Sequence, residues 1–309
     1  MQIAIGIGDI AGRPVGIDEL VAQTQRAERD GFATAWFANT FGIDALTAVA
    51  LVGRATTRIA LGTAVVPTFL RHPVAMAQQA LTTQAATGGR FSLGIGLSHQ
   101  VVIESMLGLS FAKPFTHMKE YLAVLAPLIR SGTVSHAGSE FRVNANLAVP
   151  DATPCPILLA ALAPKMLELA GAQADGTITW MTGPKTLREY TVPRINAAAA
   201  HAGRPAPRVV VGLPIAVTED VATARERAGR LFQIYGSLPS YRAMLDREGA
   251  EGPATVALVG NEDAVGEQLH ELAAIGVTEF LAVPFPVGAD SPASLERTRA
   301  LLLKVAHHR

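Results

Sequence analysis

Residues 58–96 read RIALGTAVVPTFLRHPVAMAQQALTTQAATGGRFSLGIG. The stretch opens with an apolar, β-branched run at 58–66 and closes with a second one at 90–96. Between them Pro73 predicts a helix start, because the first helical position needs no backbone donor. The glycine pair ending at Gly89 predicts the end of that helix. The stretch is therefore a strand–helix–strand unit, from which parallel sheets are built.

The same alternation continues in both directions along the chain. Short, almost uninterrupted apolar runs are separated by longer amphipathic stretches, which is typical of a parallel sheet buried on both faces. Eight strand–helix repeats that close on themselves predict an α/β fold of the (β/α)8, or TIM, barrel class. We predict strands at 2–8, 33–38, 58–66, 90–96, 157–160, 176–181, 208–217 and 279–283, and helices at about 17–30, 44–54, 72–86, 114–130, 164–173, 184–202, from 219, 262–275 and 291–307.

Two segments do not fit the repeat. Residues 131–156 are rich in Gly, Ser, Asn and Pro, and we expect an insertion, with a hairpin covering one end of the barrel. Residues 236–253 are mixed and predict an ordered loop with its own short helix. We take 1–309 as one domain with these insertions. An open doubly wound sheet is the alternative, but the first turn, 6–12, is a poor match to the Gly-rich phosphate turn of that fold.

Composition excludes several function classes. The chain has 309 residues, 49% of them hydrophobic, with 26 basic and 26 acidic residues and a formal net charge of zero. A neutral chain predicts no general attraction to nucleic acid or to an anionic membrane. No apolar run reaches the roughly 20 residues of a membrane span, and no secretory signal is visible, so we expect a cytoplasmic protein with a small-molecule substrate.

Three common kinds of catalytic site are not indicated. The single cysteine, Cys155, stands between two prolines before an apolar run, which predicts a small buried side chain and not a nucleophile. The eight histidines form no metal-ligand spacing such as HExxH, so we expect no metal site. No G-x-S-x-G nucleophile motif is present.

Three motifs together carry a resemblance to a known family. They are the run from Leu61 to Pro67, the segment from Gly88 to Gly96, and PILLAALAPKMLELAG at 156–171. With their spacing and the helix between the first two, they resemble the luciferase-like monooxygenase superfamily, and within it the F420-dependent branch of the methylene-tetrahydromethanopterin reductase kind. The resemblance covers nearly the whole chain and is specific as an ensemble.

The resemblance implies a flavin-type ring lying on a bulge at the end of the third strand. The matching residues here are Thr63, Ala64 and Val65, and in relatives the bond that corresponds to Ala64–Val65 is often a non-prolyl cis peptide. From the residues alone, an ordinary strand with small side chains is the alternative.

The end of the fourth strand, LGIGLSHQ, supplies the next candidates. Glycines at the carboxyl end of a barrel strand let a planar ring approach the backbone closely. We therefore expect Gly96, Leu97 and Ser98 at the cofactor. His99 is the candidate catalytic residue, as a donor to the ring or substrate or as a proton donor near neutral pH; capping of a local turn is the alternative.

Asn39 and Thr40 end the second strand. Relatives often place a polar pair such as Asp-His here, and this chain has neither a carboxylate nor a histidine. We expect Asn39 at the cofactor and in catalysis, and Thr40 at the substrate. A turn or capping role for Asn39 is the alternative.

Two predicted helix starts provide donors for anions, since helix N-termini carry unpaired N–H groups. At the first, the resemblance implies backbone contacts from Ala161, Leu162 and Ala163 to the cofactor's phosphate-bearing tail, with Lys165 near the anion or in solvent. At the second, we expect Trp180, Thr182 and Lys185 to bind substrate; a place in the core is the alternative for Trp180. Arg71 and His72 either meet the cofactor or cap the third helix.

The resemblance implies an F420-dependent oxidoreductase that transfers a hydride between the deazaflavin and a small organic substrate, acting as a homodimer. An FMN-dependent monooxygenase and a non-catalytic flavin-binding barrel are the alternatives. The substrate is not indicated by the sequence.

Overall fold

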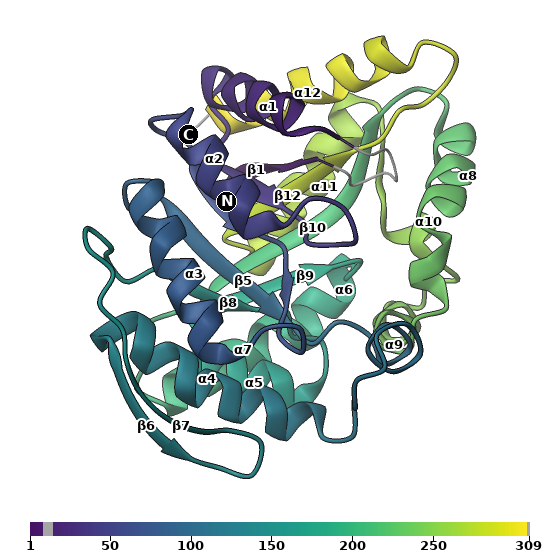
Figure 1. The fold of residues 1–309 in the computed structure, drawn as a ribbon. Helices are drawn as coiled ribbons and strands as arrows, with labels where there is room; N and C mark the ends of the chain where they lie inside the picture. Colours follow the sequence, from purple (N-terminus) through teal and green to yellow (C-terminus); the bar gives the residue numbers. More distant parts are fainter. Residues whose placement is uncertain (9–14, 308–309) are drawn as a thin grey trace.

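The computed structural model describes residues 1–8 and 15–307, so most of the first turn considered above lies outside the described residues. Eight parallel strands pair in a closed ring, because β10 pairs with both β9 and β12, and β12 pairs with β1. The predicted (β/α)8 barrel is confirmed (Figure 1). The ring consists of β1 (Gln2–Ile7), β2 (Thr34–Phe37), β3 (Ala60–Thr63), β5 (Phe91–Gly96), β8 (Ile157–Leu159), β9 (Gly176–Trp180), β10 (Arg208–Val217) and β12 (Glu279–Pro284).

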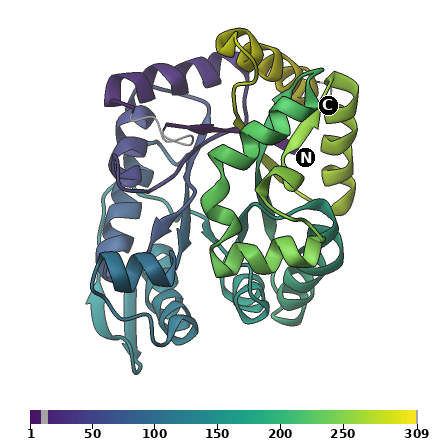
Figure 2. The same ribbon diagram turned by 90° about the vertical axis from the view of Figure 1, so that its right-hand side faces the viewer.

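Helices surround this ring and follow the predicted bounds closely (Figures 1 and 2). Their ends have the local causes expected from the sequence. Asp44 accepts a hydrogen bond from the N–H of Thr47 at 2.9 Å and so caps α2. Gly31 ends α1 with φ 89°, a left-handed conformation that favours glycine. The helices are α1 (Ile17–Asp30), α2 (Ala45–Arg54), α3 (Pro73–Ala86), α4 (Pro114–Ser131), α5 (Pro164–Gln173), α7 (Val192–His201), α8 (Val221–Leu231), α11 (Glu262–Ile275) and α12 (Ser291–His307).

Two predicted elements are interrupted. The third strand splits into β3 and the short β4 (Val66–Pro67), and the Ala64–Val65 bond between them is cis, as the resemblance implies. The helix predicted over 184–202 consists of α6 (Pro184–Thr186), a π-helical turn η2 (Leu187–Thr191) and α7. Pro193 explains the interruption, because proline has no N–H to donate and its ring clashes with the preceding turn.

Two further elements were not predicted. A π-helix η1 (Val101–Met106) follows β5, and β11 (Leu258–Gly260) lies outside the ring. β10 pairs with β9 up to Gly212 and with β11 from Ile215. Pro214, which has no N–H, therefore stands where β10 changes neighbours, and this position tolerates proline inside a buried strand.

The two insertions are ordered. The first contains the expected hairpin, β6 (Thr133–Ala137) and β7 (Arg142–Asn146), but its predicted place over one end of the barrel is wrong. The hairpin packs along α4 instead, because the carboxylate of Glu120 accepts hydrogen bonds from the N–H groups of its turn, at Ser139, Glu140 and Phe141. The second contains η3 (Gln233–Gly236), the expected helix α9 (Pro239–Glu248) and α10 (Pro253–Val256).

The amino end of the barrel interior is filled by a polar cluster. Glu279, 1% exposed, accepts hydrogen bonds from the Trp36 indole N–H and from Arg208, each at 2.8 Å. Arg208 also donates to the Ser92 hydroxyl at 2.9 Å. Hydrogen bonding and charge pairing satisfy these groups, which burial alone would destabilise. This end of the barrel is thus closed by side chains bonded to one another.

Cys155 is buried, as predicted, and burial raises the pKa of its thiol to about 12. A thiol of this kind is not a nucleophile at neutral pH. No helix in the described part of the chain has the length and hydrophobicity needed to cross a membrane.

Candidate active site

The carboxyl ends of the strands, which we call the mouth, carry a floor of small side chains. Ala64 and Val65 at the cis bond are half-buried, as are Ala38 after β2 and Ala160 after β8, whereas Gly96 is buried between them. A Cβ on Gly96 would lie 2.8 Å from Val65 Cγ2 and 3.1 Å from Ala160 Cβ. These residues therefore form one continuous floor across β3, β5 and β8, in which only glycine fits at the centre.

Thr63 supports this floor from below. It is fully buried, and its hydroxyl both donates to the Gly94 carbonyl and accepts from the Gly94 N–H, each at 2.9 Å. A Cβ on Gly94 would lie 1.9 Å from the Thr63 carbonyl oxygen, so β3 and β5 approach too closely for a side chain here. The structure thus places Thr63 in the sheet, with its side chain directed to β5.

His99 lies at the edge of the floor, three residues beyond Gly96. Ser98 precedes it with φ 65°, which turns the chain sharply out of the strand. The His99 carbonyl accepts from the N–H groups of Val102 and Ile103 and so starts η1. The backbone of His99 therefore takes the capping role, and its imidazole ring is left facing Tyr241 of α9, with 5.3 Å between ring centroids.

Three further rings continue from His99 in an aromatic arc, and Figure 1 shows α9 on the side of the loop after β5. Tyr241 lies edge-on to Tyr235 of η3, with centroids 5.1 Å apart. Tyr235 lies edge-on to Trp180 at the end of β9, with centroids 5.8 Å apart. The arc, defined here as His99, Tyr241, Tyr235 and Trp180, links the ends of β5 and β9.

The polar atoms of the arc lack strong partners. Neither the His99 imidazole nor the Tyr241 hydroxyl makes a hydrogen bond with any residue of 1–8 or 15–307. The buried Trp180 indole N–H faces the Tyr235 hydroxyl but does not reach hydrogen-bonding geometry. Such groups cost free energy unless something else binds them.

Burial also sets the charge of these groups. It lowers the pKa of His99 below its usual value, so the imidazole is neutral at pH 7. It raises the pKa of Tyr235 and, together with the neighbouring Tyr235, that of Tyr241, so both phenols stay protonated. The arc therefore offers neutral hydrogen-bond donors.

Asn39 and Thr40 lie beside the floor in different settings. The Asn39 side-chain oxygen accepts from the Ala45 N–H at 3.0 Å, which is the turn role weighed as the alternative. Its amide NH2 group is the part left to face a ligand. Thr40 is exposed.

The loop before α5 presents free donors. The N–H groups of Ala161, Leu162 and Ala163 bond to none of the described residues, and no side chain caps α5. Ala161 is buried, Leu162 half-buried and Ala163 exposed. Lys165 follows; it is exposed, makes no ion pair with any residue that the structure describes, and lies 5.9 Å from the centroid of the Phe115 ring. Free N–H groups at a helix start can receive an anion, and the contact to an anionic tail that the resemblance implies stays a prediction.

The predicted anion site at the start of α6 is already filled by the chain itself. The Glu248 carboxylate accepts from the N–H groups of Lys185, at 3.0 Å, and Thr186, at 2.7 Å. Thr182 is fully buried, and its hydroxyl bonds to the Trp180 carbonyl at 3.4 Å. The backbone donors here are therefore not available to an external anion, and only the exposed Lys185 side chain remains.

Arg71 and His72 both have structural partners. Arg71 forms an ion pair with Asp44, and His72 Nδ1 accepts from the Val74 N–H at 3.3 Å, which caps α3. His72 therefore caps the third helix, α3, which was the alternative to a cofactor contact.

Sequence reasoning missed three residues near the mouth: Tyr235, Tyr241 and Arg247. Arg247 lies 3.9 Å from the centroid of the Tyr190 ring and forms no ion pair among the described residues, while the Tyr190 hydroxyl donates to the Leu162 carbonyl at 3.2 Å. An unpaired cation thus stands beside the loop with free N–H groups. All three residues lie in or beside the second insertion, where hydrophobic periodicity carries no signal for them.

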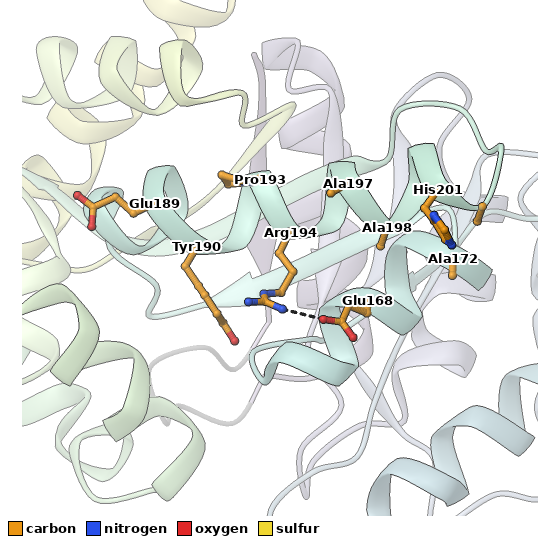
Figure 3. A pocket seen from close by; sticks show the side chains of 10 residues that line it. Glu168, Ala172, Glu189, Tyr190, Pro193, Arg194, Ala197, Ala198 and His201 are labelled. Carbon is orange, nitrogen blue, oxygen red and sulfur yellow. Dashed lines mark hydrogen bonds and ion pairs between the residues drawn. The ribbon is translucent and has the colours of Figure 1, made fainter.

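A cavity of about 600 Å³ lies elsewhere, on the outer surface between α5 and α7 (Figure 3). Its wall includes Ala172, Ala197 and Ala198, and a hydrogen bond of 2.7 Å between Arg194 and Glu168 crosses it. It lies on the outside of the barrel, and Tyr190 at one side of it reaches the loop after β8 through its hydrogen bond to the Leu162 carbonyl. Within 1–8 and 15–307 no cluster of three metal-ligand side chains occurs.

Comparisons with known proteins identify relatives of this chain. A protein of Mycobacterium tuberculosis whose name describes a coenzyme F420-dependent oxidoreductase is 33% identical over 186 residues, which is 56% of this chain and 53% of that protein. The match thus spans about half the length of that relative. The 5,10-methylenetetrahydromethanopterin reductase of Methanolobus tindarius is 29% identical over 244 residues, covering 78% of this chain and 74% of the reductase.

Among solved structures, the coenzyme F420-dependent tetrahydromethanopterin reductase of Methanopyrus kandleri superposes with a TM-score of 0.81 over 100% of both chains at 22% identity, which shows the shared fold. The profile of the luciferase-like monooxygenase family matches residues 3–279. This chain therefore belongs to the luciferase-like monooxygenase family.

Proposed function

We propose that this protein is an F420-dependent oxidoreductase that transfers a hydride between the deazaflavin and a small organic substrate. The observation that carries the proposal is the pairing of a flat floor of small side chains with a loop of free N–H groups at one end of it. A tricyclic ring needs the first feature and an anionic tail needs the second. The names of the Mycobacterium tuberculosis relative and of the Methanopyrus kandleri reductase both include F420, and this supports the choice of cofactor.

The residues fit such a cofactor in a definite way. Ala64, Val65 and Gly96 would lie under the ring, and no large side chain projects from them. Leu162 and Ala163 would bind the anionic tail through their N–H groups, with Lys165 and Arg247 supplying positive charge. When bound, F420 supplies a two-electron hydride carrier, while the protein holds it and excludes competing reactions.

His99 is the group we assign to proton transfer. Its neutral imidazole lies at the edge of the floor and has no partner in the described chain, so it is free to accept a proton from a substrate atom above the ring and to return it in the reverse direction. Asn39 is proposed as a contact to the ring edge through its NH2 group.

The test is a binding titration of the full chain with F420 and, in parallel, with FMN. F420 fluorescence should change on binding, and a saturating excess of about 100 Kd should stabilise the fold by about 2.7 kcal/mol. FMN, which the alternative monooxygenase would use, should bind at least about tenfold more weakly. No response to F420, or tighter binding of FMN, would overturn the proposal; binding of F420 without turnover of any substrate tried would favour the non-catalytic barrel.

A comparison of F420 with a ligand that lacks its anionic tail tests where that tail binds. We expect Lys165→Glu and Arg247→Glu to weaken F420 binding while leaving binding of the tail-less deazariboflavin within about twofold, because reversing these charges acts on the anionic part alone. We also propose, from the resemblance, a cytoplasmic homodimer built of one domain per chain; light scattering on the purified protein tests the dimer.

A further inference from the structure

The Tyr190 side chain connects the π-helical turn η2 to the loop before α5. It is 7% exposed, and its hydroxyl donates to the Leu162 carbonyl at 3.2 Å. Burial raises the pKa of this phenol, although the nearby Arg247 and Arg194 lower it in part, so the group is protonated at neutral pH. The hydroxyl is therefore available as a donor to the loop at neutral pH.

This hydrogen bond fixes the direction of the next N–H group. A trans peptide is planar, and its C=O and N–H point to opposite sides of the chain. Because the Leu162 carbonyl faces Tyr190, the N–H of Ala163 points away from Tyr190. That N–H bonds to none of the described residues and is one of the donors of the proposed tail site. A rotation of this peptide would turn the donor away from its present direction.

Two guanidinium groups hold the Tyr190 ring. The centroid of the ring lies 3.9 Å from Arg247 of α9 and 5.2 Å from Arg194 of α7, and Figure 3 shows Tyr190 beside Arg194. Arg194 is itself fixed to α5 through its hydrogen bond of 2.7 Å to Glu168. A cation over an aromatic face is attracted to it. The ring therefore stays in place and keeps Arg247 beside the loop.

The backbone of η2 sets the direction of this side chain. A π turn closes its hydrogen bond over one residue more than an α turn, and such turns occur frequently at functional sites. The turn spans Leu187–Thr191, so Tyr190 lies within it. In the regular helix predicted over 184–202, residue 190 would face a different direction. The interruption of that helix thus brings Tyr190 to the Leu162 carbonyl.

We infer that Tyr190 is a positioning residue for the anionic tail of the cofactor. Its hydroxyl orients the Ala163 N–H toward a phosphate group, and its ring holds the Arg247 guanidinium beside that group. The inference rests on the proposed function and deepens it by naming the residue that orders the tail site before a ligand binds. Donors that are already ordered bind without the cost of ordering them.

The experiment titrates the full chain with three ligands, deazariboflavin, its 5′-phosphate and F420, and follows ligand fluorescence. Tyr190→Phe removes the hydroxyl and keeps the ring beside Arg247. We expect F420 and the 5′-phosphate to bind about fivefold more weakly, which is the size of one hydrogen bond, and deazariboflavin to stay within about twofold. The salt dependence of F420 binding should not change, because the variant has the same charges.

A second variant removes the oriented donor itself. Ala163 has φ −74° and ψ 152°, which suit proline, and Ala163→Pro deletes an N–H that has no partner among the described residues. It should weaken binding of F420 and of the 5′-phosphate. In this background Tyr190→Phe should add less than about twofold, because the hydroxyl acts through the N–H that is missing.

Two further variants serve as controls. Tyr121→Phe removes a similar bond, from a phenol of α4 to the Arg71 carbonyl at 2.9 Å, and should leave all three affinities unchanged. Tyr190→Leu removes the ring as well as the hydroxyl. It should weaken F420 binding more than Tyr190→Phe does and flatten the salt dependence, because Arg247 loses the ring that holds it.

The outcomes distinguish the two proposals. A lack of F420 binding in the unmodified protein overturns the proposed function. The positioning role alone is overturned if F420 binds normally but Tyr190→Phe leaves the affinity for the 5′-phosphate unchanged. It is also overturned if Tyr190→Phe weakens deazariboflavin equally, or if its effect is undiminished in Ala163→Pro.

Discussion

The ion pair at the closed end of the barrel allows a worked prediction about stability. Glu279→Gln keeps the side-chain volume and leaves an oxygen for the Trp36 indole N–H, but it removes the charge that opposes Arg208. Breaking a buried ion pair costs about 3–5 kcal/mol. The Arg208 side chain is 33% exposed, so water screens part of its charge. We therefore expect a loss of about 2 kcal/mol in the free energy of unfolding.

Removing the arginine of this ion pair should cost more stability than removing the charge of the glutamate. Arg208→Met leaves the Glu279 carboxylate, which is 1% exposed, without its counter-charge, so we expect about 3–5 kcal/mol. The double variant Arg208→Met with Glu279→Gln carries no buried charge, and should recover most of the loss of Arg208→Met alone. Equilibrium unfolding in urea measures all three values.

The same variants test the separation of stability from function. Because the ion pair lies at the amino end and the floor at the carboxyl end, F420 affinity should stay within about twofold in all three. The reasoning is refuted if the double variant is no more stable than Arg208→Met, or if Glu279→Gln lowers F420 affinity strongly while the protein stays folded.

Four shorter predictions concern other sites. Gly96→Ala should cost about 1–3 kcal/mol of stability by overpacking and weaken F420 binding at least about tenfold, whereas unchanged affinity would exclude this floor. Removing the charge of Arg247 or Lys165 by substitution with Ala should flatten the salt dependence of F420 binding, measured by fluorescence titration. Burial lowers the pKa of His117 in the folded protein. The neutral ring therefore contributes its full stability above about pH 6.5, and this stability is lost as the pH falls through the lower folded pKa. The free energy of unfolding measured from pH 5 to 8 should show this loss, and His117→Asn should remove the pH dependence. Cys155 should react with a thiol reagent only when the protein unfolds, and fast labelling of the native protein would contradict its burial.

The barrel could be predicted because its signals are local. A strand such as 208–217 or a helix such as 262–275 shows its apolar pattern within its own residues, and both have the predicted bounds. The interruption of a predicted helix was missed because a single residue opposes the helical pattern of its neighbours. Pro193 breaks a good helical pattern, and no short-range signal marks the π-helix that follows β5.

The candidate site could be predicted only in part, because only some of its residues have local signals in the sequence. Residues at or just beyond the end of a strand, such as Gly96 and His99, could be placed at the mouth from the strand order alone. Tyr241 and Arg247 come from an insertion, and their approach to His99 and Tyr190 depends on how α9 packs. The sequence also cannot show that Glu248 fills the helix start at Lys185, since that contact joins residues far apart in the chain.

The two ends of the barrel differ in how their polar groups are satisfied, and this difference locates the function. At the amino end Glu279, Arg208, Trp36 and Ser92 bond to one another, which is the arrangement that stability favours. At the carboxyl end the His99 imidazole, the Tyr241 hydroxyl and the N–H groups before α5 have no partner in the described chain. Unpaired donors lower stability, so their concentration around one floor of small side chains is explained by a ligand that pairs with them.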